Sequence, residues 1–254
     1  MSAADGGPHQ EEIVSLKGKT AIVTGGSRGI GRAIAEKLAE RGASVVVNYT
    51  ASAAAASEVA KAITKAGGKA IAVQADVSKP ADVKRLFAEA EKAFGKPAIV
   101  VANAGVYVQK AIADTTDEDF DNIFSVNAKG TFFTLREAAR QVQDGGRIVA
   151  ISTGGTKLFM AGGAAYLGSK GAVEQFVRTL AYELAEHQIT VNAVSPGFTE
   201  TDMLPDKFRD FGAGMSPFKR VGTAQEVADV VAFLAGPEAG WVTGQNVQAG
   251  GGLV

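Results

Sequence analysis

The stretch TGGSRGIG at residues 24–31 follows a short apolar run, Ala21-Ile22-Val23, and an amphipathic segment begins directly after it. A glycine-rich turn between a buried strand and a helix lets the backbone turn tightly, approach a phosphate and pack the helix closely on the strand. The free N–H groups at the start of the helix favour an anion at the same place. The stretch therefore predicts a dinucleotide site with the contacts Gly25, Ser27, Arg28, Gly29, Ile30 and Gly31.

The rest of the chain repeats this alternation of strand and helix. Further apolar runs are too continuous to face water and predict buried strands at Ser44–Val47, Ala70–Val73, Ala98–Val101, Arg147–Ile151, Ile189–Val194 and Asn246–Val247. Amphipathic segments between them predict helices at about 30–41, 52–66, 80–94, 117–143, 165–187 and 223–235. Such alternation indicates an α/β fold, in which helices cover a parallel sheet of seven strands.

Composition and charge narrow the class of protein. The 254 residues are 46% hydrophobic and 21% charged, typical of one folded domain, which we place at residues 16–254 after a flexible tail at 1–15. The absence of cysteine excludes disulfides and thiol nucleophiles, and we expect a cytoplasmic protein. With a net charge of −1 and no apolar run of bilayer length, neither nucleic acid nor a membrane is an expected partner.

The end of the second strand bears on which dinucleotide binds. In an NAD site a carboxylate there would hold the ribose 2′-hydroxyl, but the chain reads Val47-Asn48-Tyr49-Thr50. Arg28 in the glycine-rich turn can instead hold a 2′-phosphate through two parallel hydrogen bonds. We therefore expect NADP(H) as the cofactor, with Asn48 as a cofactor contact or a plain strand-end residue.

Tyr166 is the one tyrosine of the chain with a lysine four residues later, Lys170, so on a helix the two side chains share a face. A phenol normally titrates near pH 10 and serves as a catalyst at neutral pH when a cation lowers its pKa. Tyr-x-x-x-Lys pairs also occur on helix surfaces, so the residues around this pair decide between the two interpretations.

Hydroxyl and amide side chains lie where neighbouring strands end. Ser152 and Thr153 follow the fifth strand, and either hydroxyl could hydrogen-bond the oxygen of a reacting carbonyl. Asn103-Ala104-Gly105 follows the fourth strand, and Asn127 lies in the next helix among apolar neighbours, where its amide needs a buried partner. Ligands bind at the carboxyl ends of strands in open α/β sheets. The candidate catalytic residues are therefore Tyr166, Lys170, Asn127, Thr153 and Ser152.

In this order the residues resemble the short-chain dehydrogenase/reductase family over about residues 17–252. The shared marks are the glycine-rich turn, Asp76 after the third strand, Asn103-Ala104-Gly105, Asn127, the hydroxyl after the fifth strand, Tyr166 with Lys170, and Pro196-Gly197 with Thr199 and Thr201. The resemblance implies a Rossmann-like, doubly wound sheet in the order 3-2-1-4-5-6-7, a nicotinamide cofactor and a homotetramer. In look the chain is closest to ketoreductases similar to the 3-oxoacyl-carrier-protein reductases.

The resemblance also implies roles for single residues. Tyr166 would be the general acid/base, Lys170 would bind the nicotinamide ribose and tune Tyr166, and Asn127 would anchor a water in the proton relay. Because the family usually has Ser where Thr153 stands, Thr153 and Ser152 both stay open for the carbonyl oxygen. Further cofactor contacts would be Asp76, Val77, Asn103, Ala104, Gly105, Pro196, Gly197, Thr199 and Thr201, beside Tyr166 and Lys170.

The long connection at residues 201–223 joins apolar side chains with glycines and prolines, a pattern that favours a mobile lid over a substrate. Its large apolar residues are Leu204, Phe208, Phe211, Met215 and Phe218, and Leu158, Phe159 and Met160 would face them. We therefore expect NADPH-dependent reduction of an uncharged, partly hydrophobic ketone to a secondary alcohol.

Other functions stay open at this point. Gln141-Val142-Gln143-Asp144 and Tyr182-Glu183 stand where basic side chains would help to dock an acidic carrier protein, which disfavours 3-oxoacyl thioesters as substrates. Arg178 and Lys219 are possible substitutes, so this substrate class stays open. Sugars or polyols are a further substrate class, and a non-catalytic NADP(H)-binding sensor or scaffold is the alternative outside enzymes. His9 and His187 do not have the spacing of metal ligands, so no metal is expected.

Overall fold

The computed structural model describes residues 16–158 and 160–254; the predicted flexible tail at 1–15 and Phe159 lie outside the described residues. One parallel sheet is formed by β1 (Thr20–Val23), β2 (Ser44–Tyr49), β3 (Lys69–Gln74), β4 (Pro97–Ala102), β5 (Arg147–Ile151), β6 (Thr190–Pro196) and β9 (Asn246–Ala249). Its order is β3-β2-β1-β4-β5-β6-β9. β7 and β8 pair with each other outside this sheet, so β9 is its seventh strand along the chain. The predicted order 3-2-1-4-5-6-7 is therefore confirmed.

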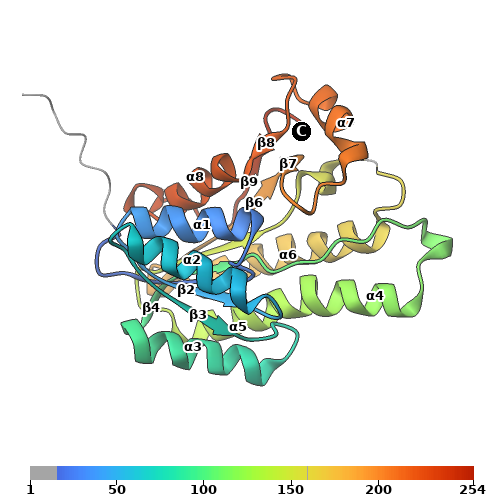
Figure 1. The fold of residues 1–254 in the computed structure, drawn as a ribbon. Coiled ribbons are helices and arrows are strands. Elements are labelled where there is room, and N and C mark those ends of the chain that lie inside the picture. Colours follow the sequence, from blue (N-terminus) through green and yellow to red (C-terminus); the bar gives the residue numbers. More distant parts are fainter. Residues whose placement is uncertain (1–15, 159) are drawn as a thin grey trace, which may run out of the picture.

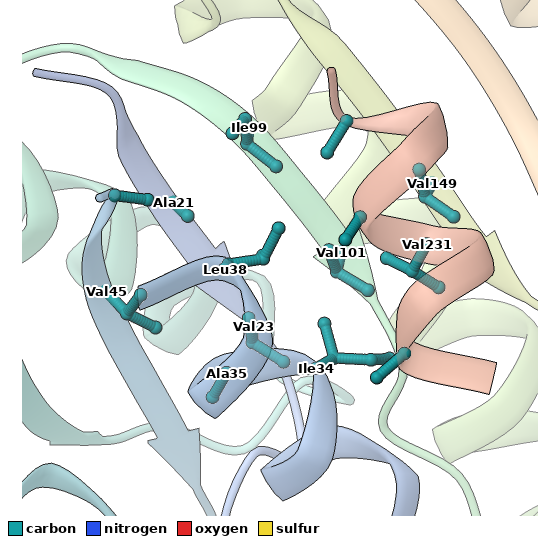
Figure 2. Packing of buried hydrophobic residues seen from close by; sticks show 14 of the residues in the cluster. Ala21, Val23, Ile34, Ala35, Leu38, Val45, Ile99, Val101, Val149 and Val231 are labelled. Atoms are coloured by element: carbon teal, nitrogen blue, oxygen red, sulfur yellow. The ribbon is translucent and has the colours of Figure 1, made fainter. Parts of the chain in front are cut away.

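Helices cover both faces of the sheet (Figure 1). One face carries α1 (Gly29–Glu40), α2 (Ala53–Lys65) and α8 (Ala224–Leu234), and the other carries α3 (Pro80–Phe94), α5 (Thr131–Gln141) and α6 (Ala164–Glu183). Successive strand residues point to opposite faces, so Val23 joins one core and Ile22 the other. Figure 2 shows Ile34 of α1 packed near Val101 and Val231. Burial on both faces explains why the central strands β1 and β4 are almost entirely apolar.

The helix expected at 117–143 is divided in the structure. α4 (Asp117–Ile123) is followed by a π-helical turn (Phe124–Gly130). This turn continues into α5, which ends at Gln141. Gly130 allows the close approach of the loop after β3, because a β-carbon there would lie 2.7 Å from Val77 Cγ2. The apolar pattern of the sequence is nearly the same for a π-helical and an α-helical turn, which is why this division was not predicted.

The connection at 201–223, here called the lid segment, is folded rather than a bare loop. It contains a 3-10 turn (Asp206–Phe208), α7 (Arg209–Met215) and β8 (Gly222–Thr223), which pairs with β7 (Thr199–Glu200). Arg209 forms ion pairs with Glu200 and Asp206. The short strand pair and these ion pairs close the lid segment into a cap beside the carboxyl ends of the strands (Figure 1).

The glycine-rich turn is packed so tightly that Gly31 has no room for a side chain. A β-carbon on Gly31 would lie 2.3 Å from the Gly25 carbonyl oxygen and 2.5 Å from Asn103 Nδ2, which is itself held by two hydrogen bonds. We expect Gly31→Ala to lower the free energy of unfolding by about 1–3 kcal/mol, measured by urea denaturation. Gly171→Ala in α6, where the added carbon meets no atom within 4 Å, is the matched control. Equal stability of Gly31→Ala and the parent would show that the turn is not tightly packed.

In residues 16–158 and 160–254, no helix has both the length and the apolar character needed to cross a bilayer. Within the same ranges, no three or more histidine and carboxylate side chains gather in a way that could hold a metal ion.

Candidate active site

Hydrogen bonds connect the segments that follow β1 and β4, at the edge of the sheet formed by the carboxyl ends of its strands. Thr24 Oγ1 accepts hydrogen bonds from the backbone N–H groups of Asn103 and Ala104, at 2.9 and 3.1 Å. Asn103 Nδ2 donates to the carbonyl oxygens of Thr24 and Gly25, at 2.9 and 3.1 Å. These bonds hold the glycine-rich turn against the loop after β4, so Asn103 shapes the predicted dinucleotide site from within the protein.

The glycine-rich turn has the features of an anion site. No side chain caps the N-terminus of α1, so its first N–H groups stay open to a phosphate. Arg28, at the N-cap position, is exposed, and among the described residues its guanidinium has no intramolecular partner. A β-carbon on Gly29 would lie 3.4 Å from Thr201 Cγ2, so the turn and the start of the lid segment lie side by side. Ser27 and Ile30 are half-buried in the same turn.

The expected place of Asn48 needs a correction. Its side chain is buried, with Oδ1 accepting from the Gly25 N–H at 3.2 Å and Nδ2 donating to the Ala75 carbonyl oxygen at 2.9 Å. Nδ2 also lies 3.3 Å from the Val73 carbonyl oxygen. Asn48 therefore holds the backbone of the glycine-rich turn from inside the protein. The first exposed residue after β2 is Thr50.

Asn48→Asp should destabilise the protein rather than change its cofactor preference. A carboxylate at this position would face carbonyl oxygens without a proton to donate, which costs about 1–3 kcal/mol of unfolding free energy. This environment raises the folded-state pKa of the new carboxyl, so the loss should be larger at pH 7.5 than at pH 4.5. Urea denaturation at both pH values measures it. A variant as stable as the parent that prefers NADH would contradict this expectation.

Asp76 and Val77 follow β3 beside the same edge. The Asp76 carboxylate accepts hydrogen bonds from the Ser78 N–H and hydroxyl, at 3.0 and 2.7 Å. Burial disfavours the charge, but these bonds and the Lys79 ammonium outweigh it and hold the pKa of Asp76 below its usual value. Val77 is buried against Gly130 of the π-helical turn. Asp76 is thus partly engaged within its own loop.

Tyr166 and Lys170 lie one turn apart on α6. Lys170 Nζ donates to the Ile151 carbonyl oxygen at 2.7 Å, and burial lowers the pKa of Lys170 to about 8. Burial raises the pKa of Tyr166 to about 12, against a hydrogen bond with the Thr153 side chain that lowers it. The expected lowering of the phenol pKa by Lys170 is not seen here, because desolvation dominates. Tyr166 therefore carries its proton at neutral pH and can donate it.

The structure places the two hydroxyls after β5 differently. The Thr153 side chain lies close enough to Tyr166 to lower the pKa of the phenol, and its Oγ1 accepts from the Gly155 N–H at 3.2 Å. Ser152 is buried, and its Oγ donates to Glu174 Oε1 at 2.9 Å. Thr153 is thus the hydroxyl beside the phenol, whereas Ser152 is turned toward a buried carboxylate.

Asn127 is buried in the π-helical turn and faces the loop after β4. Its Oδ1 accepts from the Val106 N–H at 2.8 Å, and its Nδ2 donates to the Val106 carbonyl oxygen at 2.9 Å. A β-carbon on Gly105 would lie 3.3 Å from Asn127 Oδ1 and 3.5 Å from Lys170 Nζ, so the three residues meet at one point. π-helical turns are frequent at functional sites.

The loop after β6 completes this edge of the sheet. Pro196 ends β6, the Gly197 N–H donates to the Ala249 carbonyl oxygen at 3.2 Å, and Thr199 Oγ1 donates to the Gly197 carbonyl oxygen at 3.0 Å. A β-carbon on Gly197 would lie 2.8 Å from Gly250 Cα. The loop that carries Thr199 and Thr201 is therefore held against the C-terminal segment.

Tyr107 is a residue of this site that was not predicted from the sequence. Its ring meets that of Tyr166 edge-on, with the ring centroids 4.9 Å apart and the planes at 89°. Burial raises the pKa of Tyr107, so a second neutral phenol stands beside the first. The one signal in the sequence was its place two residues after Asn103-Ala104-Gly105, where a loop leaves the carboxyl end of β4.

A doubly wound parallel sheet, a phosphate-binding turn after its first strand and a Thr–Tyr–Lys group at its carboxyl edge define a dinucleotide-dependent oxidoreductase. A family model described as enoyl-(acyl carrier protein) reductase matches residues 25–254. Tetrahydroxynaphthalene reductase of Pyricularia oryzae is 41% identical, over 97% of this chain and 93% of the relative. The chain belongs to the short-chain dehydrogenase/reductase family.

Solved structures agree with this assignment. A short-chain dehydrogenase from Burkholderia cenocepacia in complex with NADP is 38% identical with a TM-score of 0.91, over 94% of this chain and 98% of that one. The angucycline C-6 ketoreductase LanV with bound NADP is 42% identical with a TM-score of 0.90, over 94% and 96% of the two chains. Both relatives are similar to this chain over nearly its whole described length.

Proposed function

We propose that the protein is an NADPH-dependent carbonyl reductase that converts a ketone reversibly to a secondary alcohol. The observation that carries the proposal is the buried Tyr166, one helical turn from the buried Lys170 and next to the Thr153 side chain, at the carboxyl ends of the same parallel strands as the turn that fits a pyrophosphate. Solved relatives that contain NADP support the choice of cofactor. NADPH oxidation at 340 nm with a panel of ketones tests the proposal.

When bound, NADPH supplies the hydride. Tyr166 donates its proton to the carbonyl oxygen as that oxygen becomes an alkoxide, and the Thr153 hydroxyl donates a hydrogen bond to the same oxygen. Lys170 holds the nicotinamide ribose and helps the phenolate take up a proton again. Asn127 is buried between the loop after β4 and α6, where its amide donates to the Val106 carbonyl oxygen and to Ser169 Oγ. In this proposal it anchors a water in that relay.

Arg28 is proposed to select NADPH over NADH through the 2′-phosphate. NADPH should bind at least about tenfold tighter than NADH, equal to 1.4 kcal/mol. Arg28→Ala should remove most of this preference without loss of stability, because the guanidinium has no partner in the described protein. Isothermal titration with both cofactors measures it, with Arg178→Ala on the exposed side of α6 as the control. Equal affinities for NADPH and NADH in the parent would contradict this role.

The substrate is proposed to be an uncharged, partly hydrophobic ketone. Phe211 and Phe218 of the lid segment are exposed, and Tyr107 adds an aromatic wall beside Tyr166. Relatives named as reductases of a hydroxynaphthalene and an angucycline support an aromatic ketone. The panel should include aromatic ketones, a sugar, a 3-oxoacyl thioester and, given the name of the matching family model, an enoyl thioester. No NADPH oxidation with any of them would favour a non-catalytic NADP(H)-binding protein.

A cytoplasmic homotetramer is proposed as the working form. Outside the lid segment, Phe120 and Phe132 are exposed near a hollow lined by Phe124 and Phe176. Further exposed aromatic side chains are Tyr182, Phe233 and Trp241. Trp241 is 99% exposed, which is unusual for an isolated indole. Sedimentation velocity at micromolar concentration should give a tetramer, and a monomer would refute this proposal.

A further inference from the structure

We infer that Glu174, which is not among the residues predicted for the site, is a positioning residue for ketone reduction. It holds the segment 152–156 so that the Thr153 hydroxyl faces Tyr166. The inference rests on the proposed function. Its starting point is a buried carboxylate on α6, one turn beyond Lys170 and two turns beyond Tyr166, that the reaction itself does not use.

The Glu174 carboxylate binds residues on both sides of Thr153. Its Oε1 accepts hydrogen bonds from Ser152 Oγ at 2.9 Å and from Thr156 Oγ1 at 2.6 Å. Thr156 Oγ1 also lies 3.0 Å from the Thr153 carbonyl oxygen, but its single proton serves the shorter contact to the carboxylate. One oxygen atom of Glu174 therefore connects the end of β5 with the 3-10 turn at Gly154–Lys157.

A buried carboxylate without a cation is costly unless hydrogen bonds stabilise it. In the described part of the chain no ion pair involves Glu174, and Lys170 donates to the Ile151 carbonyl oxygen instead. Glu174 is therefore stabilised by the two hydroxyls. Because charged acceptors make shorter and stronger hydrogen bonds than neutral ones, the carboxylate fixes Ser152 and Thr156 more firmly than an apolar side chain would.

This arrangement gives Ser152 a role as well. Ser152 does not serve the carbonyl oxygen; it transmits the position of Glu174 to the backbone next to Thr153. The Thr153 hydroxyl then stands beside Tyr166 without a bond to Glu174. Glu174 thus acts through Thr153, and its effect should disappear when the Thr153 hydroxyl is absent.

A double-mutant cycle tests this dependence. Glu174→Ala should lower kcat for the best ketone of the panel about tenfold in the parent, but less than about twofold in a Thr153→Val background. The Kd for NADPH should stay unchanged in both, because Glu174 does not reach the glycine-rich turn. Glu174→Gln keeps an acceptor oxygen for the two hydroxyls and should recover most of the loss. Glu183→Ala, on the exposed end of the same helix, is the control.

Two results would overturn the inference. One is an equal loss of kcat from Glu174→Ala with and without the Thr153 hydroxyl, which would mean that Glu174 acts only through general stability. The other is an unchanged kcat in Glu174→Ala. If Glu174→Ala does not fold, Thr156→Val removes one of the two hydroxyls and enters the same cycle.

A crystal structure separates this inference from the proposed function. In Glu174→Ala the Thr153 hydroxyl should have moved away from Tyr166, and this can be seen without any turnover. If Thr153 is displaced in Glu174→Ala but the parent reduces no ketone, Glu174 still positions Thr153, and the proposed function is refuted. An undisplaced Thr153 in an active enzyme would do the opposite.

Discussion

Tyr166→Phe should lower kcat for ketone reduction by about 10²–10⁴-fold, the loss expected when a general acid is removed. The substitution deletes only the hydroxyl. The ring keeps its edge-on contact with Tyr107, so the surrounding site should not rearrange. The affinity for NADPH should stay within about twofold, because the phosphate-binding groups lie on the glycine-rich turn and not on α6. Fluorescence titration of NADPH and steady-state kinetics measure the two quantities separately.

Tyr182→Phe is the matched control for this experiment. Tyr182 lies on the same helix, is 87% exposed and contacts none of the site residues, so its variant should reduce ketones at the parental rate. A Tyr166→Phe variant with parental kcat would show that another group donates the proton. Tyr107, the neighbouring phenol, would then be the first candidate.

The fold was predictable because its signals lie in short stretches of sequence. The continuous apolar runs predicted the strands, of which β1, β2 and β4 are buried on both faces, and the glycine-rich turn identified the first βα unit. Gly25, Gly29 and Gly31 were predicted for a phosphate site, and the structure shows that Gly31 is also required by the Asn103 side chain packed against it. That second constraint joins residues far apart in the chain, so no local pattern could reveal it.

The candidate site was predictable in its residue types but not in how they face one another. Ser152 and Thr153 are adjacent hydroxyls at a strand end. Their roles differ because Ser152 donates to Glu174, whereas the Thr153 side chain lies next to Tyr166. Asn48 stands where a ribose contact is expected, but the carbonyl oxygens of Val73 and Ala75 accept its amide protons. The pKa of Tyr166 depends on burial more than on the nearby lysine, and burial is a property of the folded chain.

Lys170→Met should abolish most of the activity and also change how stability depends on pH. Methionine fills nearly the same volume, but it removes the ammonium, so NADPH binding should weaken and kcat should fall by at least about 10²-fold. In the parent, burial lowers the pKa of Lys170 from 10.5 to about 8, so the unfolded state binds more protons between these two pH values. The free energy of unfolding of the parent therefore rises with pH in that window. Below pH 8 Lys170 is charged in the folded protein, and its burial lowers the free energy of unfolding by the full amount.

The methionine variant lacks this titration. Relative to the parent it should be most stable below pH 8 and should lose that advantage, about 3 kcal/mol in all, as pH rises toward 10.5. Urea denaturation of the cofactor-free proteins at pH 7.5, 9 and 10 measures the difference. Lys65→Met at the exposed end of α2 should show no such trend. A difference between Lys170→Met and the parent that stays constant with pH would mean that Lys170 is solvated in the folded protein. The ammonium could then not act as the buried cation beside Tyr166.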